Sequence, residues 1–200
     1  MDLKAFYRLS EYYPKEISFL IKEDPFRFLI CVILSAQTTD KKVNEVSPIL
    51  FGKYPDADSL SKADQKTVEE IIRPLGFYSM KAKNIIATAS LIKDGIPETM
   101  EELIKLPGVG RKTASCYLGD ILGHPAIIVD THFFRVARRL GYTDANTAEG
   151  VELDLKKKVD PTLWYRMSMV LNKHGREFCY AKKPDCPGCP VKDICPSALV

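Results

Sequence analysis

The sequence lacks any long uninterrupted apolar run. Although 46% of its 200 residues are hydrophobic, no apolar stretch approaches the roughly 20 residues that a membrane-spanning helix requires. Its first residues, MDLKAFYRLSEYYPKE, also lack the apolar segment of a signal peptide. Their acidic residues argue against a mitochondrial transit segment. We therefore expect a soluble, cytoplasmic protein with no membrane partner.

Runs of β-branched residues are almost absent. The only such run, AIIVD at 126–130, is too short and solitary to build a sheet. Apolar residues instead recur at helical spacing along most of the chain, and Asp24, Asp64 and Asp160 stand where N-caps are expected. The pattern predicts an all-α fold. Expected helices cover 25–37, 41–52, 65–73, 80–95, 99–106, 111–122, 131–140, 147–158 and 161–174, with Ser79 as a further N-cap and with Gly141 and Gly175 closing two helices.

Cysteine is rare outside one short segment. Cys31 and Cys116 lie in apolar helical patterns that indicate the core. Close spacing in an intracellular chain favours a metal site over disulfides. Four thiolates can hold a zinc ion or an iron–sulfur cluster, and the number of ligands does not separate the two. The segment is CYAKKPDCPGCPVKDIC, with Cys179, Cys186, Cys189 and Cys195 as the four candidate ligands.

Positive charge is concentrated in the second half of the chain. Residues 1–104 hold 14 Lys+Arg against 16 Asp+Glu, a net charge of −2, whereas residues 105–200 hold 15 against 10, a net charge of +5. This distribution points to a polyanionic partner, with an ordinary solvated surface as the alternative. Lys182 and Lys183 lie at the crest of the loop between the first two cysteines of the segment. There they can contact phosphate or simply face solvent.

The stretch LPGVGRKTA at 106–114 joins two expected helices. Gly108 and Gly110 permit a tight turn and a close approach of the backbone to a partner. The unpaired N–H groups at the start of the next helix form an anion site, and Arg111 and Lys112 add positive charge. The alternative is a plain connection between helices. The combination fits a helix-hairpin-helix that contacts a DNA backbone, which positions a protein without reading sequence.

Lys112 and Asp130 are the candidate catalytic residues. Lys112 lies in the first turn of its helix beside Arg111, and both the helix dipole and that neighbouring cation disfavour the ammonium form. An uncharged amine can attack a sugar carbon and form a Schiff base; a second phosphate contact is the alternative. Asp130, in VDTHFFRVARRLG, is placed as an N-cap. A capping carboxylate can still use its second oxygen in chemistry.

Together these segments resemble the endonuclease III family, in the helix-hairpin-helix superfamily of DNA glycosylases with a Gly/Pro-Asp loop. The resemblance is carried by DPFRFLICVILSAQTTD, GFYSMKAKNI, LPGVGRKTA, IIVDTHFFRVARRLG, HGREFC and the cysteine spacing. It implies a two-domain, all-α protein with a [4Fe–4S] cluster rather than zinc. The first domain, 21–129, is a six-helix barrel containing the helix-hairpin-helix at about 99–122. The second combines 1–20 with 130–200 and carries the cluster.

The resemblance also implies an activity: removal of an oxidised pyrimidine from duplex DNA, followed by β-elimination 3′ to the abasic site. Lys112 stands at the family's Schiff-base lysine and Asp130 at its essential aspartate. Gln37 matches the residue that fills the space left by the flipped base, Phe77 stands where a second wedge is commonly leucine, and His132 is placed to line the base pocket. We expect a nucleoid-associated monomer acting on double-stranded DNA that contains damaged pyrimidines or abasic sites.

Two other functions remain open from the residues alone. One is a monofunctional glycosylase that uses water in place of Lys112. The other is a non-catalytic DNA-binding module whose four-cysteine tail holds a structural zinc ion.

Overall fold

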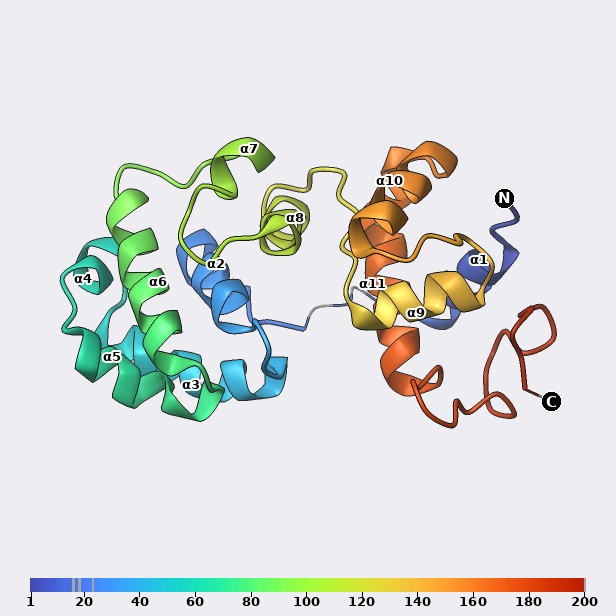
Figure 1. The fold of residues 1–200 in the computed structure, drawn as a ribbon, viewed down its shortest axis with the longest axis horizontal. Helices are drawn as coiled ribbons and strands as arrows, with labels where there is room; N and C mark the ends of the chain where they lie inside the picture. The colour runs from blue at the N-terminus through green and yellow to red at the C-terminus, as the bar shows by residue number, and fades with distance from the viewer. Residues whose placement is uncertain (16, 18, 23, 200) are drawn as a thin grey trace. The chain divides into compact units, whose positions relative to one another are not determined.

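The computed structural model describes residues 1–15, 17, 19–22 and 24–199. Within these residues the regular structure is entirely helical, so the predicted all-α class is confirmed (Figure 1). The chain divides into two compact units. The central unit is Phe19–His124, and the terminal unit joins Met1–Ser18 to Pro125–Val200. No helix in the described part of the chain is long and apolar enough to cross a membrane.

The central unit is built around α2 (Pro25–Leu34). Every residue from Phe28 to Leu34 is buried, as the apolar character of this segment on all sides predicts. Its N-cap Asp24 accepts a hydrogen bond from the Arg27 N–H and so ends the preceding loop. The remaining elements of this unit are α3 (Asp40–Lys53), α4 (Ala57–Ser61), α5 (Gln65–Ile72), η1 (Arg73–Leu75), α6 (Tyr78–Leu91), α7 (Met100–Leu103) and α8 (Arg111–Asp120).

The start of α6 differs from the expectation. The predicted N-cap Ser79 lies inside the helix, which begins at Tyr78 directly after Phe77. The Ser79 hydroxyl instead donates to Glu69 Oε1 at 2.9 Å. Because the Ser79 hydroxyl bonds a neighbouring helix, it does not cap the first amides of α6. The helix begins directly after the turn that ends at Phe77.

The terminal unit consists of α1 (Lys4–Tyr12), α9 (Thr131–Arg139), α10 (Ala148–Lys158) and α11 (Pro161–Glu177). Both α1 and α9 pack against α11, as Figure 1 shows. The prediction that Gly175 closes a helix is wrong, because α11 continues to Glu177. A Cβ on Gly175 would lie 2.9 Å from His132 Cβ and 3.2 Å from Val136 Cγ2. Glycine is needed here because α9 approaches too closely for a side chain.

Candidate functional site

The hairpin before α8 presents backbone rather than side chains. Gly108 has a φ of 77°, a left-handed conformation that favours glycine, and the Val109 N–H bonds the Leu106 carbonyl at 3.1 Å. The N-cap of α8 is Gly110, which has no side chain to accept from the first amides of the helix. Asp and Thr side chains perform that task in α2, α3, α5, α9 and α10. The start of α8 can therefore accept an anion from outside.

Lys112 is the second residue of α8 and is exposed, as is Arg111. These two basic side chains thus stand at the hairpin that precedes this helix, in the central unit. Gly108 and Gly110 lie in the hairpin, and Arg111 and Lys112 begin α8 directly after it.

Asp130 is the N-cap of α9, as predicted. Its Oδ1 accepts the Phe133 N–H at 2.7 Å. Its second oxygen is oriented by a residue that the sequence reading missed: Oδ2 accepts from Asn172 Nδ2 at 2.5 Å. The Asn172 Oδ1 in turn accepts from Arg176 Nε at 2.7 Å. Asn172 is 7% exposed on α11, so the carboxylate is fixed by two helices. The only sequence signal for Asn172 is an amide within the apolar run MSMVLNKHG.

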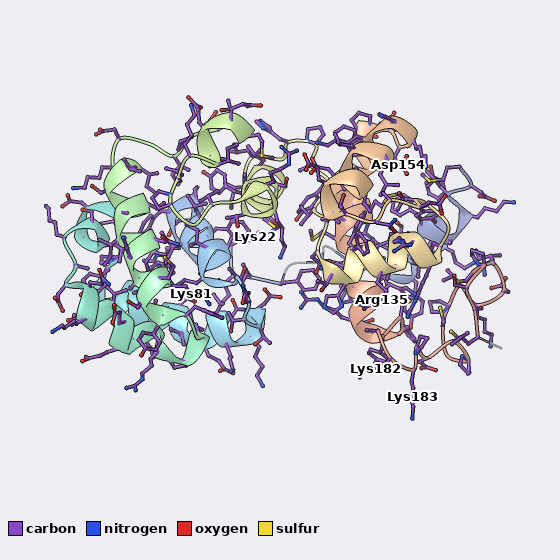
Figure 2. The ribbon with its side chains drawn as sticks, in the orientation of Figure 1. Lys22, Lys81, Arg135, Asp154, Lys182 and Lys183 are labelled. Carbon is purple, nitrogen blue, oxygen red and sulfur yellow. The ribbon has the colours of Figure 1, made fainter. Side chains whose placement is uncertain are left out.

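His132 lies two residues after Asp130 and is half-buried. The guanidinium of Arg135, which is labelled in Figure 2, lies 3.2 Å from its Nδ1 and also donates to the carbonyl oxygens of Gly175 and Cys179. Burial lowers the pKa of His132; Asp130 opposes this shift, and the guanidinium groups of Arg176 and Arg135 add to it. The imidazole is therefore neutral near pH 7 and sits in a fixed orientation.

Three candidate residues share an uncommon backbone conformation. In the described part of the chain, Gln37, Phe77 and Lys183 are the non-glycine residues with positive φ, at 54°, 49° and 49°. All three are exposed, Phe77 by 67%. Strained conformations of this kind gather at binding and catalytic sites. The neighbouring Lys182 is exposed as well (Figure 2).

The four cysteines of the tail line one pocket of the terminal unit, together with Arg139 and His174. No disulfide joins any of these four cysteines. Burial, and then the neighbouring thiols, raise the pKa of Cys189 and of Cys195. Among the residues that the structure describes, no three Cys, His, Asp or Glu side chains converge as ligands of a single metal ion.

Two side chains of the helices reach these thiols. Arg139 of α9 donates to Cys179 Sγ at 3.2 Å and to the Tyr180 carbonyl at 2.7 Å. His174 of α11 places Nε2 3.6 Å from Cys189 Sγ, and burial lowers the His174 pKa to about 4. The tail is thus attached to the same two helices that hold Asp130.

Known proteins with similar sequences and structures identify the family of this chain. The family model described as HhH-GPD superfamily base excision DNA repair protein matches residues 30–161. The endonuclease III of Synechocystis sp. is 43% identical over 195 residues, which cover 95% of this chain and 89% of that protein. That of Rickettsia conorii is 39% identical, covering 96% and 93%.

A solved non-covalent endonuclease III–DNA complex is also similar. It has a TM-score of 0.92 and 36% identity, and the match covers 97% of this chain and 93% of that one. The expectation of the family is confirmed. The chain belongs to the HhH-GPD superfamily of base excision DNA repair proteins, within the endonuclease III family.

Proposed function

We propose that this protein is a bifunctional DNA glycosylase and abasic-site lyase that removes oxidised pyrimidines from duplex DNA. The observation that carries the proposal is an exposed lysine, Lys112, in the first turn of a helix that begins at a glycine hairpin. Support comes from the similarity to a trapped covalent endonuclease III–DNA intermediate, with a TM-score of 0.90 and 36% identity over 98% of this chain and 95% of that one.

The proposed chemistry begins at Lys112 Nζ. The uncharged amine attacks C1′ of the damaged nucleotide, the glycosidic bond breaks, and the base leaves with the bonding electrons and gains a proton. The sugar ring then opens to a Schiff base. Loss of a C2′ proton breaks the C3′–O bond and releases the 3′ strand, and water hydrolyses the imine to free the lysine.

Asp130 is proposed to stabilise the positive charge that develops on the sugar and to assist the proton transfers. The hydrogen bonds from Phe133 and Asn172 hold both carboxylate oxygens in place. Such pre-orientation means that little reorganisation is needed during the reaction. His132, neutral and held beside Arg135, is proposed to line the pocket that receives the flipped base.

Contacts to duplex DNA are proposed for the two groups of exposed residues. Gln37 and Phe77 would fill the space left by the flipped nucleotide, and base–aromatic stacking is worth about 1–3 kcal/mol per base. Lys182 and Lys183 would contact phosphates, together with Arg111 and the amides after Gly108 and Gly110. We further propose that residues 21–129 and 1–20 with 130–200 are the two domains, and that the protein acts as a monomer.

The test uses duplexes that carry thymine glycol, dihydrouracil, an abasic site or a mismatch. Wild-type protein is expected to release the oxidised bases and nick the strand, and Lys112→Gln to lose nicking while it still binds. Full base release by Lys112→Gln would instead favour the glycosylase that uses water. Loss of binding together with nicking would make Lys112 a phosphate contact.

We propose that the cysteine pocket holds a [4Fe–4S] cluster through Cys179, Cys186, Cys189 and Cys195. A zinc ion and a [4Fe–4S] cluster can each be held by four cysteine thiolates, and the four cysteine side chains line one pocket. Similarity to the endonuclease III family favours the cluster. When bound, the cluster crosslinks the tail.

Iron analysis tests this part separately. Purified protein is expected to contain about four irons per chain, to absorb visible light and to lose that absorbance when Cys189 is replaced by serine. Colourless protein with one zinc and no iron would favour the zinc-tail alternative.

A further inference from the structure

One face of α6 carries polar side chains in an otherwise apolar interior. Lys81 is 5% exposed and Thr88 is 0% exposed, and the half-buried Asn84 lies between them. Residues seven apart lie on the same face of a helix, about 10 Å apart along its axis. Burying polar groups is costly unless they are hydrogen-bonded, so each of these needs a partner.

Lys81 holds the turn that precedes its own helix. Its Nζ donates to the Leu75 carbonyl at 3.0 Å, and its backbone N–H donates to the Phe77 carbonyl at 3.0 Å. The two acceptors, Leu75 and Phe77, lie on either side of Gly76, and the φ angles of Gly76 and Phe77 are 68° and 49°. Figure 2 labels Lys81 on α6. A strained turn that leaves Phe77 exposed is thereby fixed from both sides.

The hydrogen bond to the Leu75 carbonyl requires the amine of Lys81 to be buried. Burial lowers its pKa, which means that the site disfavours the ammonium form relative to an exposed lysine. A methionine could fill much of the same space without this penalty. What it could not supply is the donor for the Leu75 carbonyl.

The other end of the same face supports the hairpin before α8. Thr88 Oγ1 donates to the Pro107 carbonyl at 2.8 Å. Asn84 Nδ2 lies 3.0 Å from where a Cβ of Gly108 would stand, and Ile33 Cγ2 is equally close. The left-handed glycine of the hairpin therefore rests directly on α6 and α2.

We infer that Lys81 and Thr88 are positioning residues, which use α6 as one rigid support for two DNA-facing turns. Lys81 fixes the turn that exposes Phe77, and Thr88 fixes the hairpin that leads to Lys112. The inference rests on the proposed glycosylase–lyase function and adds to it the residues that set the separation between wedge and nucleophile. Both side chains are buried, so each would act through the turn to which it is hydrogen-bonded.

The experiment compares two single-turnover rates at 25 °C: base removal from a thymine glycol duplex, and strand cleavage of a duplex with a preformed abasic site. Lys81→Met is expected to slow base removal about tenfold, and abasic cleavage less than about twofold, because an abasic site has no base to unstack. Thr88→Val is expected to slow both rates by about threefold. Lys66→Met and Ser90→Ala, exposed changes of the same chemistry, are the controls.

A double-mutant cycle separates positioning from general stability. Phe77→Ala should slow base removal, and Lys81→Met should then add nothing, because its effect passes through Phe77. If Lys81→Met does not fold, Gly76→Ala disturbs the same turn in another way. A Cβ at position 76 would meet nothing within 4 Å, but the φ of 68° at this position is strained for alanine. The effect of Gly76→Ala should also vanish in the Phe77→Ala background.

Additive effects, or a Lys81→Met enzyme indistinguishable from Lys66→Met, would overturn the inference. So would an unchanged rate in Phe77→Ala alone. If wild-type protein neither releases the base nor cleaves the abasic site, the proposed function itself fails, and that result is distinct from all of these.

Discussion

Replacing Gly175 with alanine would place a methyl group where α11 meets α9. The new Cβ would lie 2.9 Å from His132 Cβ and 3.3 Å from His132 Cα. These atoms belong to the backbone and the base of a side chain, so a rotamer change cannot relieve the contact. The two helices must move apart by a few tenths of an ångström, at the point where Asp130 and Asn172 join them.

Two opposing free energies set the expected magnitude. Alanine is favoured over glycine inside a helix by about 0.8–1.0 kcal/mol, whereas overpacking costs about 1–3 kcal/mol. The net loss is about 1 kcal/mol, which lowers the melting temperature by roughly 2–4 °C in a chain of this size. Gly52→Ala in α3 is the control, since its Cβ would meet nothing within 4 Å and only the helical preference remains.

The assay is thermal unfolding by circular dichroism, followed by single-turnover base removal. Gly175→Ala should melt below wild type and lose activity, and Gly52→Ala should melt at or above wild type with activity unchanged. A Gly175→Ala protein that is stabilised like Gly52→Ala would refute the close approach of α9 and α11.

Three further predictions concern single side chains. Asn172→Ala removes the donor to Asp130 Oδ2. Because a hydrogen bond to a charged group contributes about 1.5–3 kcal/mol, the rate of base removal should fall about 10- to 100-fold while the affinity for DNA is kept. An unchanged rate would mean that Asn172 does not orient the carboxylate. Burial lowers the pKa of His132, so the imidazole of the unfolded chain binds a proton at a higher pH than that of the folded chain. The contribution of neutral His132 to the free energy of unfolding is therefore present above pH 6.5 and is lost as the pH falls through the lowered pKa. An NMR titration should place the midpoint below the ordinary value of 6.5, and one at or above it would contradict the burial argument. Asp24→Ala removes the N-cap of α2 and should lower the free energy of unfolding by about 1 kcal/mol in urea, whereas no change would mean that the cap is not needed.

Helices with local start signals could be predicted from the sequence. Asp24, Asp64, Asp130 and Asp160 each cap a helix by accepting a backbone N–H, and the signal lies within three residues. The N-terminal α1 was not anticipated, because its N-cap Leu3 supplies no side-chain hydrogen bond. The five-residue α4 is too short for a periodic pattern.

Residues whose roles depend on tertiary contacts could not be predicted from the sequence. Gly175 suggests a helix end, but its reason is a neighbour on α9 about 40 residues earlier. Asn172 bonds Asp130 across 42 residues, and Lys81 looks like any surface lysine of an amphipathic helix. Local patterns cannot reveal a residue whose partner is set by packing.

The Schiff-base role of Lys112 is tested most directly by borohydride trapping of wild-type protein on a duplex with an oxidised pyrimidine, followed by peptide mapping. We predict a reduced covalent adduct on the peptide that contains Lys112, and none with Lys112→Gln. An adduct on a different lysine, or base release and nicking without any adduct, would contradict this role.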